Sequence, residues 1–195
     1  MTAPASFTVE ALTPARWPDL EAVFLARGCS VARGCWCMYY RQSGTPSTAS
    51  GPAAVGARRQ SLKALVDAGR FTGLIGYRDA QPVGWVSFGP REDFAKLAQS
   101  PVMKPVDEQL VWSIICFVVP AAHRRQGVAS ALLQGAVAWA AAHGVALLEA
   151  YPIDKAGRSN DQNLWFGSQS MFDAAGFHEV ARRRPGRPVL RIHPV

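Results

Sequence analysis

The sequence lacks any apolar run long enough to cross a membrane as a helix, because its longest run, around residues 114–119, has the length of a buried strand. Its first residues lack the charged head and long apolar core of a signal peptide. Charged residues are few, at 18% against 49% hydrophobic residues, and this balance excludes a disordered chain. The 195 residues suffice for one globular domain with a sizeable core, which we expect in the cytoplasm.

Cysteine is also rare, with Cys29, Cys35, Cys37 and Cys116 only. In the cytoplasm these side chains are expected to be reduced thiols. Cys35 and Cys37 do not have the spacing of a usual zinc pair, and no histidine lies at ligand spacing nearby. We therefore expect no metal site, and we interpret the cysteines as small apolar packing residues.

Acidic residues are the minority, with 14 Asp and Glu against 21 Lys and Arg. Much of the basic excess lies in two places, Arg124–Arg125 and the segment 182–191. A basic chain can bind nucleic acid. However, no interleaved aromatic residues or known nucleic-acid motif accompany the second cluster. We expect a phosphorylated small molecule at the first cluster and a solvated hairpin at the second, and neither nucleic acid nor a membrane as partner.

Hydrophobic periodicity, with breaks at Gly and Pro, predicts elements in the order β-α-α-β-β-β-α-β-α-β-β. A short helix over 92–99 is a further candidate, and residues 28–44 are expected to be irregular. The main predicted strands cover 7–12, 71–77, 82–88, 111–119, 145–151, 178–183 and 189–192, and the main helices cover 14–27, 52–68, 128–143 and 164–175. Polar loops are expected at 43–51 and 154–163.

Residues 111–130 are the most informative stretch, with the sequence VWSIICFVVPAAHRRQGVAS. A buried strand ends at Pro120, a short basic loop follows, and an Ala-rich helix begins at Val128. A helix N-terminus presents unpaired N–H groups and the positive end of the helix dipole. Small residues at Gly127 and Ala129 allow close approach of an anion to the backbone. The pattern therefore predicts a phosphate-binding loop.

This loop resembles motif A of the GNAT acetyltransferase superfamily, Gln/Arg-x-x-Gly-x-Gly/Ala, with Arg124, Gly127 and Ala129 in the three defined positions. Residues 171–177, MFDAAGF, resemble motif B of the same family, and the order of elements is similar from end to end. The resemblance implies an α/β GNAT fold over residues 1–195 as a single domain. Such a fold has a central mixed, mostly antiparallel sheet flanked by helices.

The resemblance also implies acetyl-CoA as cofactor and an amine as acetyl acceptor. By position in the family, the backbone amides of Phe117, Val118 and Val119 polarise the thioester carbonyl. Phe172 occupies the motif B position where the family often places a tyrosine, and we include it among the cofactor contacts. The loop contacts to the cofactor are Arg124, Arg125, Gln126, Gly127, Val128, Ala129 and Ser130.

The acid and base of the reaction remain open, because Phe172 cannot donate a proton. Tyr151, Tyr39 or Tyr40 could protonate the leaving thiolate, or it could leave without a dedicated acid. Base candidates are Glu149, which interrupts an apolar strand, the carboxylates Asp107, Glu108, Glu92 and Asp93, and water. Our catalytic hypothesis contains Glu149, Tyr151 and Glu108. Cys116 could form an acyl-enzyme, but no histidine base is evident beside it in the sequence, which favours direct transfer.

The segment 34–41, GCWCMYYR, occupies the position where the family covers the acceptor. Aromatic residues there suit stacking on sugars, rings or cations, although a plain core cluster would explain them as well. With the segments 112–117 and 149–154, it resembles a bacterial subgroup that is similar to kasugamycin 2′-N-acetyltransferases, which inactivate an aminoglycoside. This implies an aminoglycoside as the preferred acceptor. The predicted acceptor contacts are Trp36, Tyr39, Tyr40, Asp107 and Trp112.

Two other functions fit the same sequence. One is acetylation of protein lysines or N-termini, and the other is binding of acyl-CoA without catalysis. Turnover distinguishes the enzymes from the binding module. A homodimer, with the C-terminal hairpin as an edge, is expected by analogy with the family.

Overall fold

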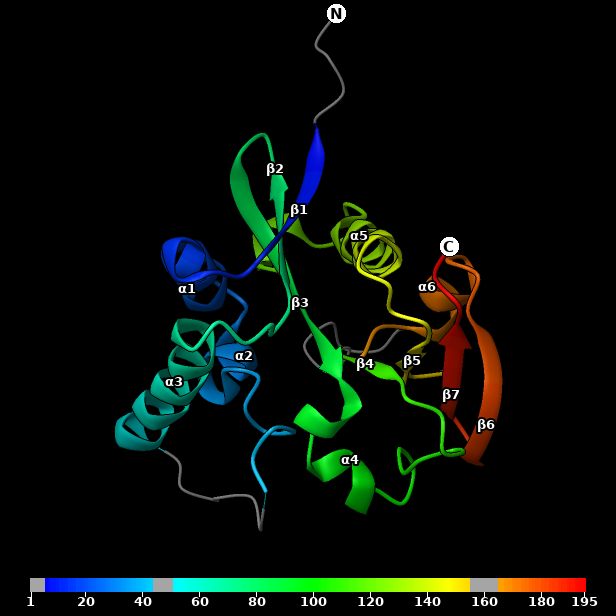
Figure 1. The fold of residues 1–195 in the computed structure, drawn as a ribbon. Helices are drawn as coiled ribbons and strands as arrows, with labels where there is room; N and C mark the ends of the chain where they lie inside the picture. Colours follow the sequence, from blue (N-terminus) through cyan, green and yellow to red (C-terminus); the bar gives the residue numbers. More distant parts are fainter. Residues whose placement is uncertain (1–5, 44–50, 155–164) are drawn as a thin grey trace, which may run out of the picture.

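The computed structural model describes residues 6–43, 51–154 and 165–195. Its sheet has seven strands in the order β1-β2-β3-β4-β5-β7-β6 (Figure 1). Every neighbouring pair is antiparallel except β4 and β5, which are parallel. The predicted mixed, mostly antiparallel sheet is thereby confirmed. The strands are β1 Phe7–Ala11, β2 Leu74–Arg78, β3 Gln81–Pro90, β4 Trp112–Val118, β5 Leu148–Ala150, β6 His178–Arg184 and β7 Arg187–Ile192.

Helices lie on both faces of this sheet. In Figure 1, α1, α2 and α3 gather on one side of β3, and α5 lies on the other. The helices are α1 Trp17–Leu25, α2 Ser30–Cys35, α3 Pro52–Asp67, α4 Lys96–Gln99, α5 Val128–Ala142 and α6 Gln169–Asp173. Short 3-10 turns cover Pro14–Arg16, Arg91–Asp93 and Ala121–His123.

The predicted order of strands and main helices is confirmed, with three differences. Helix α2 forms inside the segment predicted to be irregular. The helix predicted over 92–99 divides into a 3-10 turn and α4. The helix predicted over 164–175 is shortened to α6, because Gly167 has a left-handed φ of +79°. Most of the two predicted polar loops lies outside the described residues.

Each face of the sheet has its own core, because side chains alternate along the strands. Leu74 and Val86 face α5 and join a cluster with Leu132 and Leu133. Their chain neighbours Ile75 and Trp85 join the opposite cluster with residues of α1, α2 and α3.

Helix α5 lies unusually close to the sheet where β2 and β3 carry glycine. A Cβ atom at Gly76 would lie 2.8 Å from the Leu132 Cδ2 atom, and one at Gly84 would lie 2.9 Å from its Cδ1 atom. Both are shorter than ordinary contacts, so a larger residue at either position would force the Leu132 side chain to move. The close packing fixes the start of α5 beside the end of β4.

Strands β4 and β5 pair only over a short parallel ladder, which ends at Ile114 and Ala150. Beyond this point β5 stops, while β4 continues to Val118. Ile115 is an extra residue in β4, because Cys116 pairs with Ser87 and Ile114 with Phe88. After Ile114, the edge of β4 that pairs with β5 therefore has no further residue of β5 beside it.

Candidate active site

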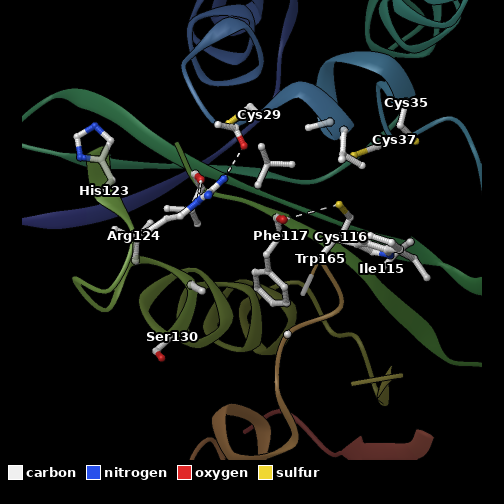
Figure 2. A pocket seen from close by; sticks show the side chains of 18 of the residues that line it. Cys29, Cys35, Cys37, Ile115, Cys116, Phe117, His123, Arg124, Ser130 and Trp165 are labelled. Carbon is white, nitrogen blue, oxygen red and sulfur yellow. Dashed lines mark hydrogen bonds between the residues drawn. The ribbon is translucent and has the colours of Figure 1, made fainter. Parts of the chain in front are cut away.

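A cavity of about 640 Å³ lies along this end of β4 (Figure 2). Its volume is within the range of small-molecule and cofactor sites. One end is formed by the loop and first turn of α5, and the other by the segment after α2. Its lining residues come from the segments 28–40, 115–119, 123–130 and 165–167.

The first turn of α5 forms one end of the cavity. The first residue bonded within the helix is Ala131, whose N–H donates to the Gly127 carbonyl at 2.9 Å. The N–H groups of Val128, Ala129 and Ser130 therefore have no partner in their own helix, and no side chain caps them at Gly127. Unpaired N–H groups at the positive end of a helix dipole attract anions.

The backbone of the loop before α5 shapes this end of the cavity. Arg125 and Gly127 both have left-handed φ angles, of 57° and 77°. A Cβ atom at Gly127 would meet no protein atom within 4 Å, so the space in front of it is open. Phosphate groups can therefore approach the N–H groups closely, and the residues present fit a phosphorylated cofactor.

Three side chains of the loop have different roles from one another. Arg124 donates to the carbonyls of Val119 and Gly28, and so links the end of β4 to the segment after α1. Gln126 accepts from Arg78 at 2.8 Å and donates to the Ala122 carbonyl at 2.8 Å. Arg125 is exposed and lines the cavity. Of these side chains, Arg124 and Gln126 hold the loop in shape.

The middle of the cavity is the wall formed by β4. Phe117, Val118 and Val119, whose amides the resemblance assigned to the thioester carbonyl, line it, and the Phe117 N–H donates to the Trp165 carbonyl at 2.7 Å. This bond bridges the gap that the end of β5 leaves. The Phe117 N–H is therefore occupied in this structure.

Aromatic and sulfur-containing side chains form the far end of the cavity, namely Cys35, Cys37, Tyr39, Tyr40, Cys116 and Trp165. Tyr40 is half-buried, and burial is the main cause that raises the pKa of its hydroxyl to about 12. Tyr40 therefore keeps its proton at neutral pH. Among the described lining residues there is no Asp or Glu.

The structure places Glu149 and Tyr151 in the interior of the protein and away from the cavity lining, against our catalytic hypothesis. Glu149 is 0% exposed and accepts from Arg91 at 2.7 Å and from Arg191 at 2.8 Å. The Tyr151 hydroxyl donates to Glu149 at 2.6 Å, and burial raises its pKa well above the usual value. The carboxylate that interrupts the apolar strand is explained by its two arginine partners.

The other carboxylates that the sequence offered also lie outside the described lining. Asp107 forms two hydrogen bonds with Arg191, which lower the pKa of its carboxyl. Asp93 pairs with Arg41 and Arg70. Glu108 and Glu92 are exposed on the surface. As a result, the predicted catalytic role of Glu108 and the acceptor role of Asp107 have no support from their positions.

Three predicted aromatic contacts pack in the core instead. Trp36 is 1% exposed and stacks between Trp17 and Phe24, with ring centroids 5.9 and 5.0 Å away. Phe172 is fully buried and makes an edge contact with Phe117. Trp112 packs against Trp139 on the α5 side of the sheet. Of the predicted aromatic acceptor contacts, Tyr39 and Tyr40 line the cavity.

The C-terminal arginine cluster binds the protein's own groups. Arg182 pairs with Glu179 and Asp154, and Arg183 donates to the carbonyls of Val102, Lys104 and Pro105. Arg187 lies over the Phe166 ring. The Arg183 contacts attach β6 to the segment after α4. All three arginines have partners in the protein, so the hairpin is less solvated than the sequence suggested.

Two features are absent from the described residues. No helix in them is both long and apolar enough to cross a membrane. Within the same residues, no group of three or more His, Cys, Asp and Glu side chains could hold a metal ion.

Comparison with known proteins identifies the family of the chain. Residues 37–160 match the family model described as the acetyltransferase (GNAT) family. No curated protein matches the chain significantly in sequence.

Solved structures share the fold. An N-acetyltransferase from Staphylococcus aureus Mu50 is 14% identical, with a TM-score of 0.53 and coverage of 97% of this chain and 99% of the other. YncA from Salmonella typhimurium, solved with its cofactor acetyl-CoA, is 14% identical with a TM-score of 0.52, over 97% and 94% of the two chains. A ribosomal-protein-alanine N-acetyltransferase from Brucella melitensis is 18% identical with a TM-score of 0.51, over 95% and 98%. At these identities the likeness concerns the fold alone.

Proposed function

Because the chain belongs to the GNAT family of acetyltransferases, which use acetyl-CoA, we propose that it acetylates a primary amine of a small molecule by direct transfer. The observation that carries the proposal is one continuous cavity, which joins the uncapped start of α5 to an end lined by aromatic and sulfur-containing side chains. The first end suits phosphates and the second suits a compact acceptor.

The start of α5 would hold the phosphates of the cofactor. The N–H groups of Val128, Ala129 and Ser130 supply hydrogen bonds, and Arg125 supplies positive charge. Arg124 and Gln126 act indirectly, because their hydrogen bonds keep the loop in place. When bound, acetyl-CoA supplies an activated acyl group and a thiol as leaving group.

Tyr40 is the proposed proton donor. It lines the far end of the cavity, and its pKa of about 12 keeps the hydroxyl protonated at neutral pH. The raised pKa makes Tyr40 a weaker acid than an ordinary tyrosine, so its proposed contribution is a hydrogen bond that stabilises the departing thiolate and through which the proton can follow. Since no carboxylate is among the described lining residues, water is the proposed acceptor of the amine's proton.

The lining also bears on the acceptor. An aminoglycoside carries several ammonium groups, which require carboxylates around the site. The carboxylates that could have supplied them are exposed elsewhere or paired with arginines. An amine with an aromatic or apolar body fits Tyr39, Tyr40 and Trp165 better.

The test is release of free thiol from acetyl-CoA across a panel of acceptors. The panel contains aromatic monoamines, aliphatic amines, kasugamycin and other aminoglycosides, lysine peptides and a peptide with N-terminal alanine. Turnover with a small monoamine supports the proposal, and turnover with kasugamycin would restore the aminoglycoside. Turnover with peptides alone would indicate protein acetylation. Silence of the whole panel while acetyl-CoA binds would contradict the proposal and favour an acyl-CoA-binding module.

The homodimer and the cytoplasmic location stay predictions from the sequence and the family. Light scattering at several protein concentrations measures the first of them directly.

A further inference from the structure

Three thiols line the far end of the cavity, and the proposed acetyl transfer uses none of them. Cys35 and Cys37 come from the end of α2, and Cys116 comes from β4 (Figure 2). We call these three residues the cysteine cluster. All are free thiols in the structure.

The backbone that brings Cys37 to the cavity is strained. Trp36 and Cys37 both have left-handed φ angles, of 49° and 51°. A left-handed conformation is unfavourable for a bulky residue and persists only where the surroundings enforce it. Here Trp36 is held in the core by Trp17 and Phe24, and the turn places the next residue, Cys37, in the cavity wall.

The Cys37 sulfur is surrounded by hydrogen-bond donors. A hydrogen bond with the Cys116 thiol is the main cause that lowers the pKa of Cys37, against the effect of burial. Trp85, Ser87 and the nearby Arg41 guanidinium lower this pKa further. Among the described residues the buried Nε1 atom of Trp85 has no hydrogen-bond partner, so its N–H stays free to donate if the Cys37 side chain moves toward it.

The other thiols show the opposite behaviour. The hydrogen bond with Cys37 and burial raise the pKa of Cys116 well above the usual value. Burial also raises the pKa of Cys35 and of Cys29. Cys116 Sγ lies 3.8 Å from the Phe117 carbonyl oxygen, to which it can also donate (Figure 2). The cluster therefore combines one thiol whose pKa is lowered with a second thiol whose pKa is raised, in the same cavity wall.

We propose that Cys37 and Cys116 are a modification site that a peroxide converts into a reversible disulfide. A nucleophilic thiolate beside a second, resolving thiol is the arrangement of redox-sensitive sites. Because Cys37 and Cys116 line the same end of the cavity and pack in one cluster, a local movement of the two side chains would bring the sulfurs to a bond of about 2.05 Å. The disulfide joins the end of α2 to β4 across the far end of the cavity.

The chemistry proceeds in two balanced steps. The Cys37 thiolate attacks one peroxide oxygen, an S–O bond forms, the O–O bond breaks, and hydroxide leaves. The sulfur is thereby oxidised to a sulfenic acid by two electrons, and the peroxide is reduced. The Cys116 thiol then attacks this sulfur, an S–S bond forms, the S–O bond breaks, and water leaves with the thiol proton.

The experiment treats the reduced full-length protein with hydrogen peroxide and follows its intact mass. We expect a loss of about 2 Da, the two hydrogens of a disulfide, which a phosphine reductant restores. Cys29→Ser and Cys35→Ser should show the same loss, and Cys37→Ser should not. Cys116→Ser should stop at the sulfenic acid, which dimedone traps at Cys37.

Three results would overturn the proposal. The wild-type protein could gain the mass of oxygen without losing hydrogen, or it could show no change of mass. The loss of about 2 Da could also disappear in Cys35→Ser. Circular dichroism establishes that each variant is folded, and disulfide mapping of the unreduced wild-type protein tests the pairing without any substitution. None of these measurements requires acetyl-CoA or an acceptor, so failure of the proposed function and failure of this disulfide are separate outcomes.

Discussion

Glu149 and Arg191 face one another directly across the β5–β7 ladder, and Arg191 Nε donates to Glu149 Oε2 at 2.8 Å. Both side chains are buried, and Arg91 donates to the second carboxylate oxygen at 2.7 Å. Arg191 also pairs with Asp107 at 2.6 Å, so two carboxylates and two guanidinium groups form one network. Removing Glu149 from this network would leave buried charge poorly compensated, which is costly.

Glu149→Gln is expected to lower the free energy of unfolding by about 3 kcal/mol, because Arg91 loses its carboxylate partner and Arg191 keeps only Asp107. Urea denaturation measures this change, and Asp67→Asn is the matched control. Asp67 pairs with Lys63 on the exposed surface, with side chains 49% and 39% exposed, so its loss should cost less than about 1 kcal/mol. Full stability combined with lost turnover in Glu149→Gln would instead restore Glu149 as the catalytic base.

Gly127→Ala is expected to weaken acetyl-CoA binding by at least about tenfold, or ~1.4 kcal/mol, because the new methyl group occupies the open space before the first turn of α5. Gly144→Ala is a matched control at the other end of the same helix. Gly144 has a similar φ, of 71° against 77°, and equally open surroundings. Titration calorimetry should show the loss of affinity in the first variant alone. Equal affinities would mean that the start of α5 does not hold the phosphates.

The order of elements and the phosphate loop could be predicted because both depend on neighbours in the sequence. Pro120 ends a strand, and Gly127 and Ala129 stand at fixed distances before a helix. Backbone N–H groups at a helix start need no distant partner to form a site. The structure accordingly places the loop residues among the cavity lining, with the exception of Gln126.

The catalytic candidates could not be predicted in the same way, because their surroundings come from distant segments. The partners of Glu149 lie 58 and 42 residues away in the sequence. Trp36 follows α2 in a left-handed turn, and this turn directs its side chain into the core. No periodic pattern in the sequence indicates such a turn. The extra residue in β4 interrupts the alternation of side chains, so that Ile115, Cys116 and Phe117 all line the cavity. Alternation alone therefore could not reveal the cysteine cluster.

Tyr40→Phe is expected to lower kcat by about 100-fold and to leave KM for acetyl-CoA unchanged, since the phenyl ring keeps the packing but cannot donate a proton. Tyr39→Phe is the control, because Tyr39 packs edge-on against Tyr40 at 4.9 Å and is 45% exposed. Steady-state thiol release with the acceptor found in the panel measures both variants. Unchanged kcat in Tyr40→Phe would show that the thiolate leaves without this acid.

Alkylation by iodoacetamide should label Cys37 faster than the other three cysteines at neutral pH. A lowered pKa means that the Cys37 thiolate persists as the pH falls below the ordinary cysteine value of about 8.5, whereas Cys29, Cys35 and Cys116, whose pKa values are raised, are protonated there. Cys116→Ala removes the donor that contributes most to the lowered pKa of Cys37. The pH at which the labelling rate of Cys37 reaches half its maximum should therefore move upward. Site-resolved mass spectrometry over a pH series measures these rates. Labelling of Cys37 no faster than that of Cys35 would show that the donors around Cys37 do not stabilise a thiolate.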